Sequence, residues 1–411
     1  MRAVCDCIEP LQILRGAKPG DPDRRAADRR DQPAEPTCLR TFEASQRDFP
    51  PKPFLRPSCP VSFPFSKSIK IFDILNIDLG FFIREKSVAG VLSQTLRRWV
   101  GYPDLAIDLG TATTRLAAAD SPSMLERPSV IIPDDARQRS PLSPLRGGVV
   151  IDCEAAASVL EGLFHGLKRY GLIKPRVLAC APTDATDAER AALVRAVRMA
   201  GAAAVEVAPE PLAAAIGAGL DVSLPRAQMV VDIGEGVTDI AVIRSGTLVS
   251  ASAIRVACGD LHAAVGERIS SDHGAFLPRG GSERLIKLIG ADFPPPLPAH
   301  ILTRAITEEG KRDTWLKVDP RLLWRTLSPI YEKIVKQVGA TLRDLPPSLF
   351  CEVIENGICL TGGGALLPGI SRRLFSEVKV DVKVAGAPLH AVIDGARAML
   401  STAIEIDLWR R

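Results

Sequence analysis

Short apolar runs alternate with helix-like stretches over most of the chain after Tyr102. Apolar runs that end in Gly, Pro or Thr predict buried strands. These runs are Leu105 to Leu109, Val177 to Ala181, Met229 to Ile233, Ile240 to Ile243 and Gly357 to Leu360. The stretches with helical periodicity are Ala188 to Met199, Leu212 to Ala218 and Ser328 to Leu342. Strands that alternate with helices predict an α/β protein.

The beginning of the chain differs in amino-acid composition from the rest. Its first part is rich in Pro, Arg and Asp, so it offers little apolar surface to offset the entropy lost on ordering. The run from Ser68 to Phe82 is more apolar and fits a short strand, a docking segment or non-native sequence. We interpret residues 1–87 as a disordered tail or as the product of a start assigned too far upstream.

An amphipathic helix is predicted over residues 88–100. Its apolar positions recur at steps of three and four residues, and they are Val88, Val91, Leu92, Leu96, Trp99 and Val100. Two interpretations remain open: the helix packs on the following domain, or it lies on a membrane surface. In the second, Trp99 sits at the interface and two arginines face anionic lipid.

Length and composition narrow the class of protein. A chain of 411 residues is too long for one ordinary core and predicts two domains. With 46% apolar and 24% charged residues it resembles a soluble globular protein. The net charge of +4 gives no general electrostatic footprint for nucleic acid.

The cysteines and the chain start point to the cytoplasm. Several of the nine cysteines lie inside apolar runs, which is typical of buried thiols in a reducing compartment. Cys5 and Cys7 have no second pair that would complete a zinc site. The sequence has no uninterrupted run of eighteen apolar residues and no secretory signal pattern, so we expect a cytoplasmic protein.

A first candidate phosphate loop follows the strand at Leu105 to Leu109. Gly110 lets the backbone approach an anion, and the hydroxyls of Thr111 and Thr113 can donate to phosphate oxygens. Asp108, at the end of the strand, can hold a magnesium ion through water. A tight hairpin turn would have the same appearance.

A second strand, glycine turn and strand begins at Met229. Asp232 occupies the place of Asp108 and predicts a second carboxylate on the magnesium side, while Thr238 is a candidate contact to phosphate or water. Glu235 would repel a triphosphate unless it faces the cation or its waters. Two such hairpins face each other only in an internally duplicated clamp, with one phosphate loop from each half.

Two further loops complete the candidate site. Gly362, Gly363 and Gly364 end a strand, and three glycines let the main chain lie flat against a base and ribose. Glu210 begins a helix that also carries proline in its first turn. Its carboxylate is a candidate for placing or activating the attacking water, although an acid there is also ordinary helix capping.

With these loops, residues 103–400 resemble the bacterial actin MreB, the rod-shape-determining filament protein. The matching pieces besides the loops are Glu126-Arg-Pro-Ser-Val, Pro175-Arg-Val-Leu-Ala-Cys-Ala-Pro-Thr, Arg190, Cys258-Gly-Asp and Ser282-Glu-Arg-Leu. The combination is specific, although no single piece is.

The resemblance implies an actin-like fold of the actin, DnaK and hexokinase type: a duplicated two-lobe ATPase with a nucleotide cleft between its lobes. Residues 101–225 with 385–411 would form the first lobe, with a reduced outer subdomain, and 226–384 the second. It also implies ATP and magnesium, slow hydrolysis, and a homopolymer on the inner face of the cytoplasmic membrane that organises the cell-wall elongation machinery.

The resemblance also assigns site residues. The family's water-activating glutamate falls on Glu210. The nucleotide contacts fall on Gly110, Thr111, Ala112, Thr113, Gly234, Glu235, Gly236, Glu283, Lys287, Gly362, Gly363, Gly364 and Ala365.

The chain departs from the family pattern at several positions. Glu235 and Val237 replace residues of the usual Asp-x-Gly-Gly-Gly-Thr-Thr, and Ile286 replaces the usual lysine near the base, with Lys287 one step round the helix. Pro209 replaces the first glutamate of Glu-Glu-Pro. The segment between Val130 and Val149 is shorter than is typical of the family, and it belongs to an outer subdomain that carries filament contacts there.

Three functions compete at this point. The first is an ATP-dependent cytoskeletal filament protein, and the second is a divergent, non-polymerising paralogue that acts as a scaffold or regulator. Loss of hydrolysis with retained binding in Glu210→Ala would favour the first. The third is an actin-fold chaperone or sugar kinase, which the short stretch after Leu400 and the lack of a sugar-binding signature disfavour.

Overall fold

The computed structural model describes residues 104–131, 142–166, 174–292, 298–307 and 312–405. All of them belong to the compact unit Phe65–Arg411. The predictions for residues 1–87 and for the helix at 88–100 lie outside the described residues, as does the 132–141 part of the shortened segment.

The first sheet combines an antiparallel meander with two parallel strands. Its strand order is β3-β2-β1-β6-β7, and β1 is central and fully buried. The strands are β1 (Leu105–Leu109), β2 (Thr113–Ala118), β3 (Met124–Pro128), β6 (Arg176–Ala181) and β7 (Ala204–Pro209). β1 pairs antiparallel with β2 and parallel with β6, as its run of apolar residues on both faces favours.

The second sheet repeats this arrangement strand for strand. Its order is β10-β9-β8-β14-β15, with β8 antiparallel to β9 and parallel to β14. The strands are β8 (Gln228–Ile233), β9 (Thr238–Arg244), β10 (Thr247–Ile254), β14 (Ile358–Thr361) and β15 (Val382–Val384). Each glycine turn of interest therefore joins the first two strands of one copy of the same unit.

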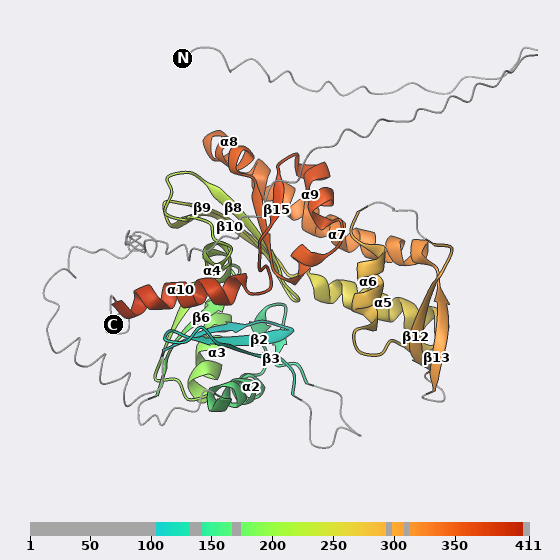
Figure 1. Ribbon diagram of the computed structural model, residues 1–411, viewed down its shortest axis with the longest axis horizontal. Helices are drawn as coiled ribbons and strands as arrows, with labels where there is room; N and C mark the ends of the chain where they lie inside the picture. The colour runs from blue at the N-terminus through green and yellow to red at the C-terminus, as the bar shows by residue number, and fades with distance from the viewer. Residues whose placement is uncertain (1–103, 132–141, 167–173, 293–297, 308–311, 406–411) are drawn as a thin grey trace, which may run out of the picture. The chain divides into compact units, whose positions relative to one another are not determined.

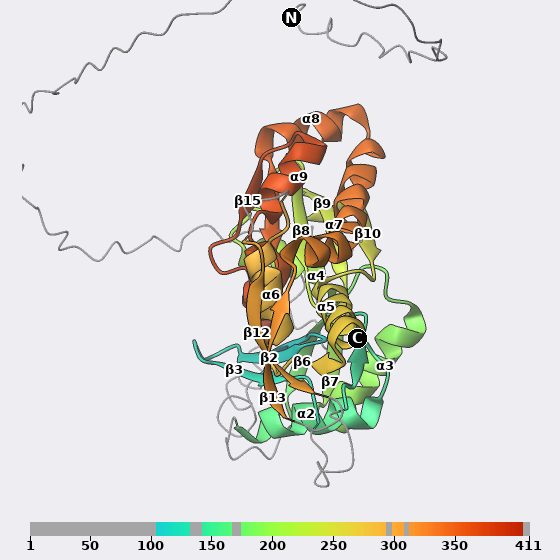
Figure 2. The same ribbon diagram turned by 90° about the vertical axis from the view of Figure 1, so that its right-hand side faces the viewer.

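Helices cover the outer face of each sheet and close two separate cores. The first core lies under α2 (Cys153–Gly166) and α3 (Asp187–Met199). The second is larger and lies under α5 (Cys258–His273), α6 (Gly281–Ile289), α7 (Pro320–Arg343), α8 (Pro347–Asn356) and α9 (Ile370–Val378). Figure 2 shows α7, α8 and α9 gathered around the second sheet.

Smaller elements complete the described chain. A three-stranded antiparallel sheet contains β11 (Ala275–Phe276), β12 (Ile301–Thr307) and β13 (Asp313–Val318). A short pair is formed by β4 (Leu145–Arg146) and β5 (Val149–Val150), and the 3-10 turn η3 spans Gly363–Leu366. Among the described residues, no helix combines the length and apolar character needed to cross a membrane.

Two helices lie between the two sheets (Figure 1). α4 (Glu210–Gly217) and α10 (Ala391–Glu405) share a third core with Ala106 and Leu178 of the first sheet and Val230 of the second. The helices cross at two glycines, since a methyl group on Gly217 would overlap the backbone of α10 and one on Gly395 would overlap that of α4. This close approach joins the two halves through backbone packing.

The strands and helices predicted after Tyr102 are present, and most differ only slightly at their ends. The helix expected over residues 328–342 begins earlier, at Pro320, where the side chain of Asp319 caps it by accepting from the backbone N–H of Arg321 at 2.8 Å. Pro329, which favours a helix start in the sequence, lies inside this helix. The lobe boundaries at residues 225 and 385 stay a prediction.

Candidate functional site

The two glycine turns lie against each other. One joins β1 to β2 and the other joins β8 to β9. A methyl group on Gly236 would overlap the Thr111 hydroxyl and lie 2.6 Å from the backbone nitrogen of Gly148. The Gly148 N–H in turn donates to Thr111 Oγ1 at 3.0 Å. Because the turns come from equivalent places in the two sheets, the duplication brings the predicted phosphate loops together.

The first turn is tight and rests on a neighbouring strand end. A methyl group on Gly110 would lie 2.9 Å from the carbonyl oxygen of Thr113. Ser129 donates its hydroxyl to the Gly110 carbonyl at 2.6 Å and its N–H to the Ala112 carbonyl at 2.9 Å. Ala112 is exposed, while Thr111 and Thr113 are half-buried. The turn therefore offers backbone groups and threonine hydroxyls at a fixed place.

Three acidic side chains lie in the buried region behind the turns. Asp108, Asp232 and Asp239 are at most 6% exposed. Burial raises the pKa of Asp232 to about 7, and the charges of Asp239 and Asp108 act in the same direction. Burial also raises the pKa of Asp108, although the guanidinium of Arg115, 3.3 Å away, opposes this shift.

Glu210 starts α4 beside the same acids. Burial raises the pKa of its carboxyl well above the usual value, and the charges of Asp239, Asp108 and Asp232 raise it further. Oδ1 of Asp232 and Oδ2 of Asp239 are buried without a hydrogen-bond partner in the described structure. Buried acids that repel one another and have free oxygens fit a divalent cation, which would compensate their charge.

The described ranges contain no three His, Cys, Asp or Glu side chains close enough to hold a metal by themselves. The prediction for Asp108 and Asp232 is contact through water, and it does not require such a closed set. Magnesium commonly keeps several waters and takes its remaining ligands from one or two carboxylates and from phosphate oxygens.

Thr238 is placed differently from what the sequence indicated. Its side chain is fully buried, and its hydroxyl donates to the carbonyl of Val256 at 2.8 Å. The hydroxyl hydrogen is therefore already used within the fold. This geometry does not favour the predicted contact to phosphate or water.

Asp239, the next residue, was missed by sequence reasoning. Its Oδ1 accepts from the N–H of Thr183 at 2.9 Å and from the Thr183 hydroxyl at 2.7 Å. Thr183 follows β6, so this contact joins the second sheet to the first. Burial raises the pKa of Asp239 to about 6. The only local signal was a charged residue inside an apolar strand.

The triple glycine packs closely on the end of β8. A methyl group on Gly362 would overlap the carbonyl of Ile233, and one on Gly364 would overlap the Ile233 side chain. Gly363 is different, because its nearest neighbour, a Leu389 methyl, would lie 3.7 Å from such a group. The structure thus gives two of the glycines a packing reason that the sequence argument overlooked. Ala365 is buried beside them.

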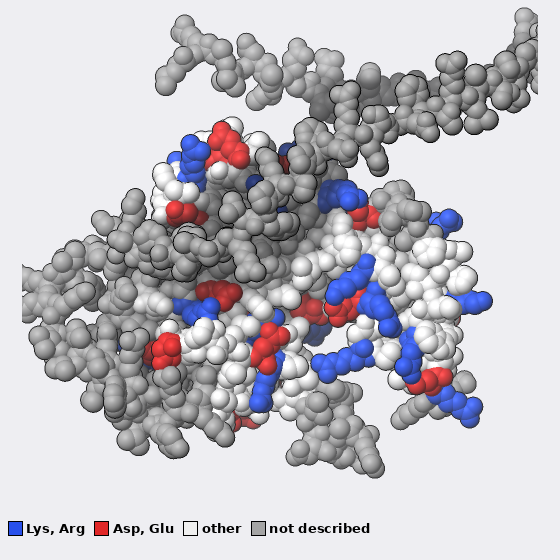
Figure 3. All heavy atoms as spheres, in the orientation of Figure 1, with Lys and Arg blue, Asp and Glu red and all other residues white. Residues whose placement is uncertain are grey.

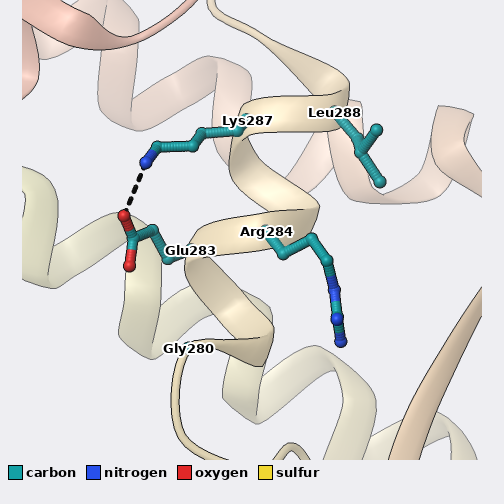
Figure 4. Close-up of a pocket in the computed structure, with 5 residues that line it drawn as sticks. All are labelled: Gly280, Glu283, Arg284, Lys287 and Leu288. Atoms are coloured by element: carbon teal, nitrogen blue, oxygen red, sulfur yellow. Dashed lines mark hydrogen bonds and ion pairs between the residues drawn. The ribbon is translucent and has the colours of Figure 1, made fainter.

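Glu283 and Lys287 lie together on α6. Lys287 Nζ is 2.6 Å from Glu283 Oε1, and both residues line an open hollow of ≈ 380 Å³ with Gly280, Arg284 and Leu288. Figure 4 shows Glu283 and Lys287 turned toward each other, with Arg284 and Leu288 on the other side of the helix. In the region of α6, acidic and basic side chains lie next to each other on the surface (Figure 3). Ile286 is 1% exposed and belongs to the core.

Glu235 is paired across the second turn. Its Oε1 lies 2.9 Å from Nδ1 of His262 on α5. The start of α5 is attached to the same turn, because Cys258 N–H donates to the Gly234 carbonyl at 3.2 Å and Gly259 N–H donates to the Glu235 carbonyl at 2.7 Å. The acid that sequence reasoning could not accommodate thus has a basic partner.

Two sheets of identical strand order, a pair of helices between them and two glycine turns in contact define an actin-like fold. A family model described as MreB/Mbl protein matches residues 137–407. The chain belongs to this family, which confirms the resemblance seen in the sequence.

Curated relatives agree with this assignment. The chain is 32% identical to the cell shape-determining protein Mbl of Bacillus subtilis, over 72% of this chain and 95% of that protein. It is also 32% identical to the cell shape-determining protein MreB of Escherichia coli, over 71% of this chain and 91% of that protein.

Among solved structures, MreB5 of Spiroplasma citri bound to AMPPNP matches with a TM-score of 0.66 and 26% identity, covering 75% of this chain and 98% of that chain. The same protein has also been solved bound to ADP. A MamK double helical filament matches with a TM-score of 0.57 at 19% identity, covering 73% of this chain and 98% of that chain, and supports the fold alone.

Proposed function

We propose that this chain binds ATP with magnesium at the two facing glycine turns and hydrolyses it slowly. The observation that carries the proposal is the set of buried, mutually repelling acids directly behind the contact between the turns. The Spiroplasma citri relative, solved with AMPPNP and with ADP, supports the nucleotide.

The proposed roles follow from the placement of each group. Thr111, Thr113 and the backbone N–H groups of both turns bind the phosphates, and Gly363 offers a flat backbone to the nucleoside. Asp108 and Asp232 hold magnesium through water. When bound, magnesium neutralises charge on the phosphates and the acids.

Glu210 is proposed to orient the attacking water and take its proton. Its carboxyl tends to keep a proton while the surrounding acids are uncompensated, because burial and their charges raise its pKa. With magnesium held at Asp108 and Asp232, Glu210 would be a carboxylate able to accept the proton, because the added positive charge would offset the neighbouring acids. Hydrolysis is then coupled to correct loading of the site.

We further propose that the protein assembles with itself into filaments at the inner face of the cytoplasmic membrane. There it would govern cell shape by organising the cell-wall elongation machinery. The names of the Bacillus subtilis and Escherichia coli relatives, both cell shape-determining proteins, support this role. The helix predicted over residues 88–100 is the proposed membrane contact.

The test is sedimentation of the full chain with magnesium-ATP or without nucleotide, with phosphate release followed in parallel. We expect ATP-dependent pelleting with slow phosphate release, loss of both in Asp232→Ala, and retained binding without hydrolysis in Glu210→Ala. Addition of anionic vesicles tests the membrane contact. Absence of both assembly and ATP binding in the unaltered chain would refute the proposal.

One observation favours a second candidate, a non-polymerising scaffold or regulator with weak ATPase activity. Thr238 donates its hydroxyl to the Val256 carbonyl, so in this arrangement it does not offer that hydrogen to a phosphate oxygen. The two candidates differ in the sedimentation experiment: the scaffold binds ATP but neither pellets nor releases phosphate faster than Glu210→Ala.

A further inference from the structure

The second glycine turn carries an acid where phosphates are proposed to bind. Glu235 stands between Gly234 and Gly236, and its side chain is 26% exposed. A carboxylate so near a polyphosphate lowers affinity for it, because like charges in a half-buried site are poorly screened. Something in the fold must therefore offset this charge.

His262 is positioned next to Glu235 by the packing of α5 on the turn. It lies in the first part of α5, and that helix is anchored to the turn by the N–H groups of Cys258 and Gly259. Gly259 allows the approach, since a methyl group there would lie 2.7 Å from the Glu235 carbonyl oxygen. The imidazole Nδ1 then reaches Glu235 Oε1 at 2.9 Å.

The surroundings of His262 favour its charged form. The hydrogen bond to Glu235 raises the pKa of the imidazole, burial opposes this, and the charge of Glu235 raises it further. Glu283 on α6 also raises it, and Lys287 on the same helix lowers it. The charges of Glu235, Glu283 and Lys287 thus act on the ring. His262 therefore responds both to the second turn and to the residues that line the α6 hollow.

We propose that His262 is a positioning residue of the nucleotide site, which neutralises Glu235 so that the second turn accepts the phosphates of a nucleoside triphosphate. The inference rests on the proposed nucleotide function. In this proposal His262 and Glu235 act together, so the effect of changing one of them on ATP affinity depends on whether the other is present. Removal of the base should be harmful, whereas removal of both partners should not.

The test measures binding of magnesium-ATP and of adenosine to the full chain by titration calorimetry. His262→Gln keeps a hydrogen-bond donor but loses the charge, and we expect it to weaken ATP binding about tenfold, which corresponds to about 1.4 kcal/mol. Adenosine binding should not change, because adenosine has no phosphates. Glu235→Gln should bind ATP at least as well as the unaltered chain, and the double variant should return close to it.

His273→Gln is the matched control, since it makes the same change at an exposed position of the same helix. Thermal unfolding of every variant shows whether the fold is kept. Unchanged ATP affinity in His262→Gln, or equal losses for ATP and adenosine, would overturn the role of the pair while the proposed nucleotide site stands. If the unaltered chain binds no ATP, the proposed function fails, and the inference fails with it.

Discussion

The two glycine turns occupy equivalent positions in duplicated sheets, yet the acidic side chains at the two turns differ in which partners they have. Behind the first turn, Asp108 has an internal partner in Arg115, 3.3 Å away. Behind the second, Asp232 has a buried oxygen with no partner. The acid within the second turn, Glu235, is paired with His262 instead. The two halves therefore share a backbone arrangement but differ in how the acids behind their turns are paired, and the proposed cation would compensate the unpaired oxygen of Asp232.

The sharpest test of this difference compares the two strand-end acids. We expect Asp232→Asn to lower magnesium-ATP affinity at least about 100-fold and Asp108→Asn about tenfold, each tenfold corresponding to about 1.4 kcal/mol. The reason is that Asp108 forms an ion pair with Arg115, whereas Arg115 acts on Asp232 only through its more distant charge, so more of the Asp232 charge would be available to the proposed cation. Titration calorimetry at fixed magnesium measures both, and equal losses would mean that the two acids are equivalent.

The contact between the turns can be broken at Gly236. We expect Gly236→Ala to destabilise the protein by about 1–3 kcal/mol, the usual cost of overpacking, because its methyl group would overlap Thr111 and press on Gly148. Gly363→Ala is the matched control. Its methyl group would come no closer than 3.7 Å to a neighbouring atom, which is ordinary van der Waals contact, so this substitution should be neutral or stabilise the protein by up to about 1 kcal/mol.

Denaturant unfolding of both variants measures the effect. If Gly236→Ala proves no more costly than Gly363→Ala, the turns are not packed against each other in solution. A drop in ATP affinity for Gly236→Ala beyond its loss of stability would indicate that the contact also shapes the phosphate site.

The smallest expected effect is a dependence of stability on pH in the absence of nucleotide. The pKa values of Asp232 and Asp239 are raised from 3.8 to about 7 and about 6. A carboxyl with a raised folded-state pKa contributes stability that is full below its unfolded value and is lost as the pH rises through the folded value. The nucleotide-free protein should therefore be more stable at about pH 5.5 than at about pH 8, by at least about 1 kcal/mol.

Unfolding by denaturant across this pH range checks the sign. Asp232→Asn should flatten the profile, since it removes the group with the larger shift, and magnesium-ATP should restore stability at the higher pH. A stability that rises with pH over this interval would contradict the view that these acids are uncompensated.

Much of the fold could be predicted because its signals are local. The apolar run of β8 is buried along nearly its whole length, and alternation of strands with helices follows from periodicity alone. The side of α6 that faces the core could also be predicted from the sequence. Ile286 falls on the apolar side with Leu285 and Ile289, which leaves Lys287 on the side of Glu283.

The sequence by itself thus determined the strands, the helices, the duplicated turns and the family, since each depends on residues close together in the chain. Only the tertiary structure decided which charges are balanced. His262 meets Glu235, and Thr183 meets Asp239, across 27 and 56 residues of chain. Gly362 and Gly364 have no room for a side chain because Ile233, far away in sequence, packs against them. Such pairings depend on how sheets and helices pack, which no local pattern of residues encodes.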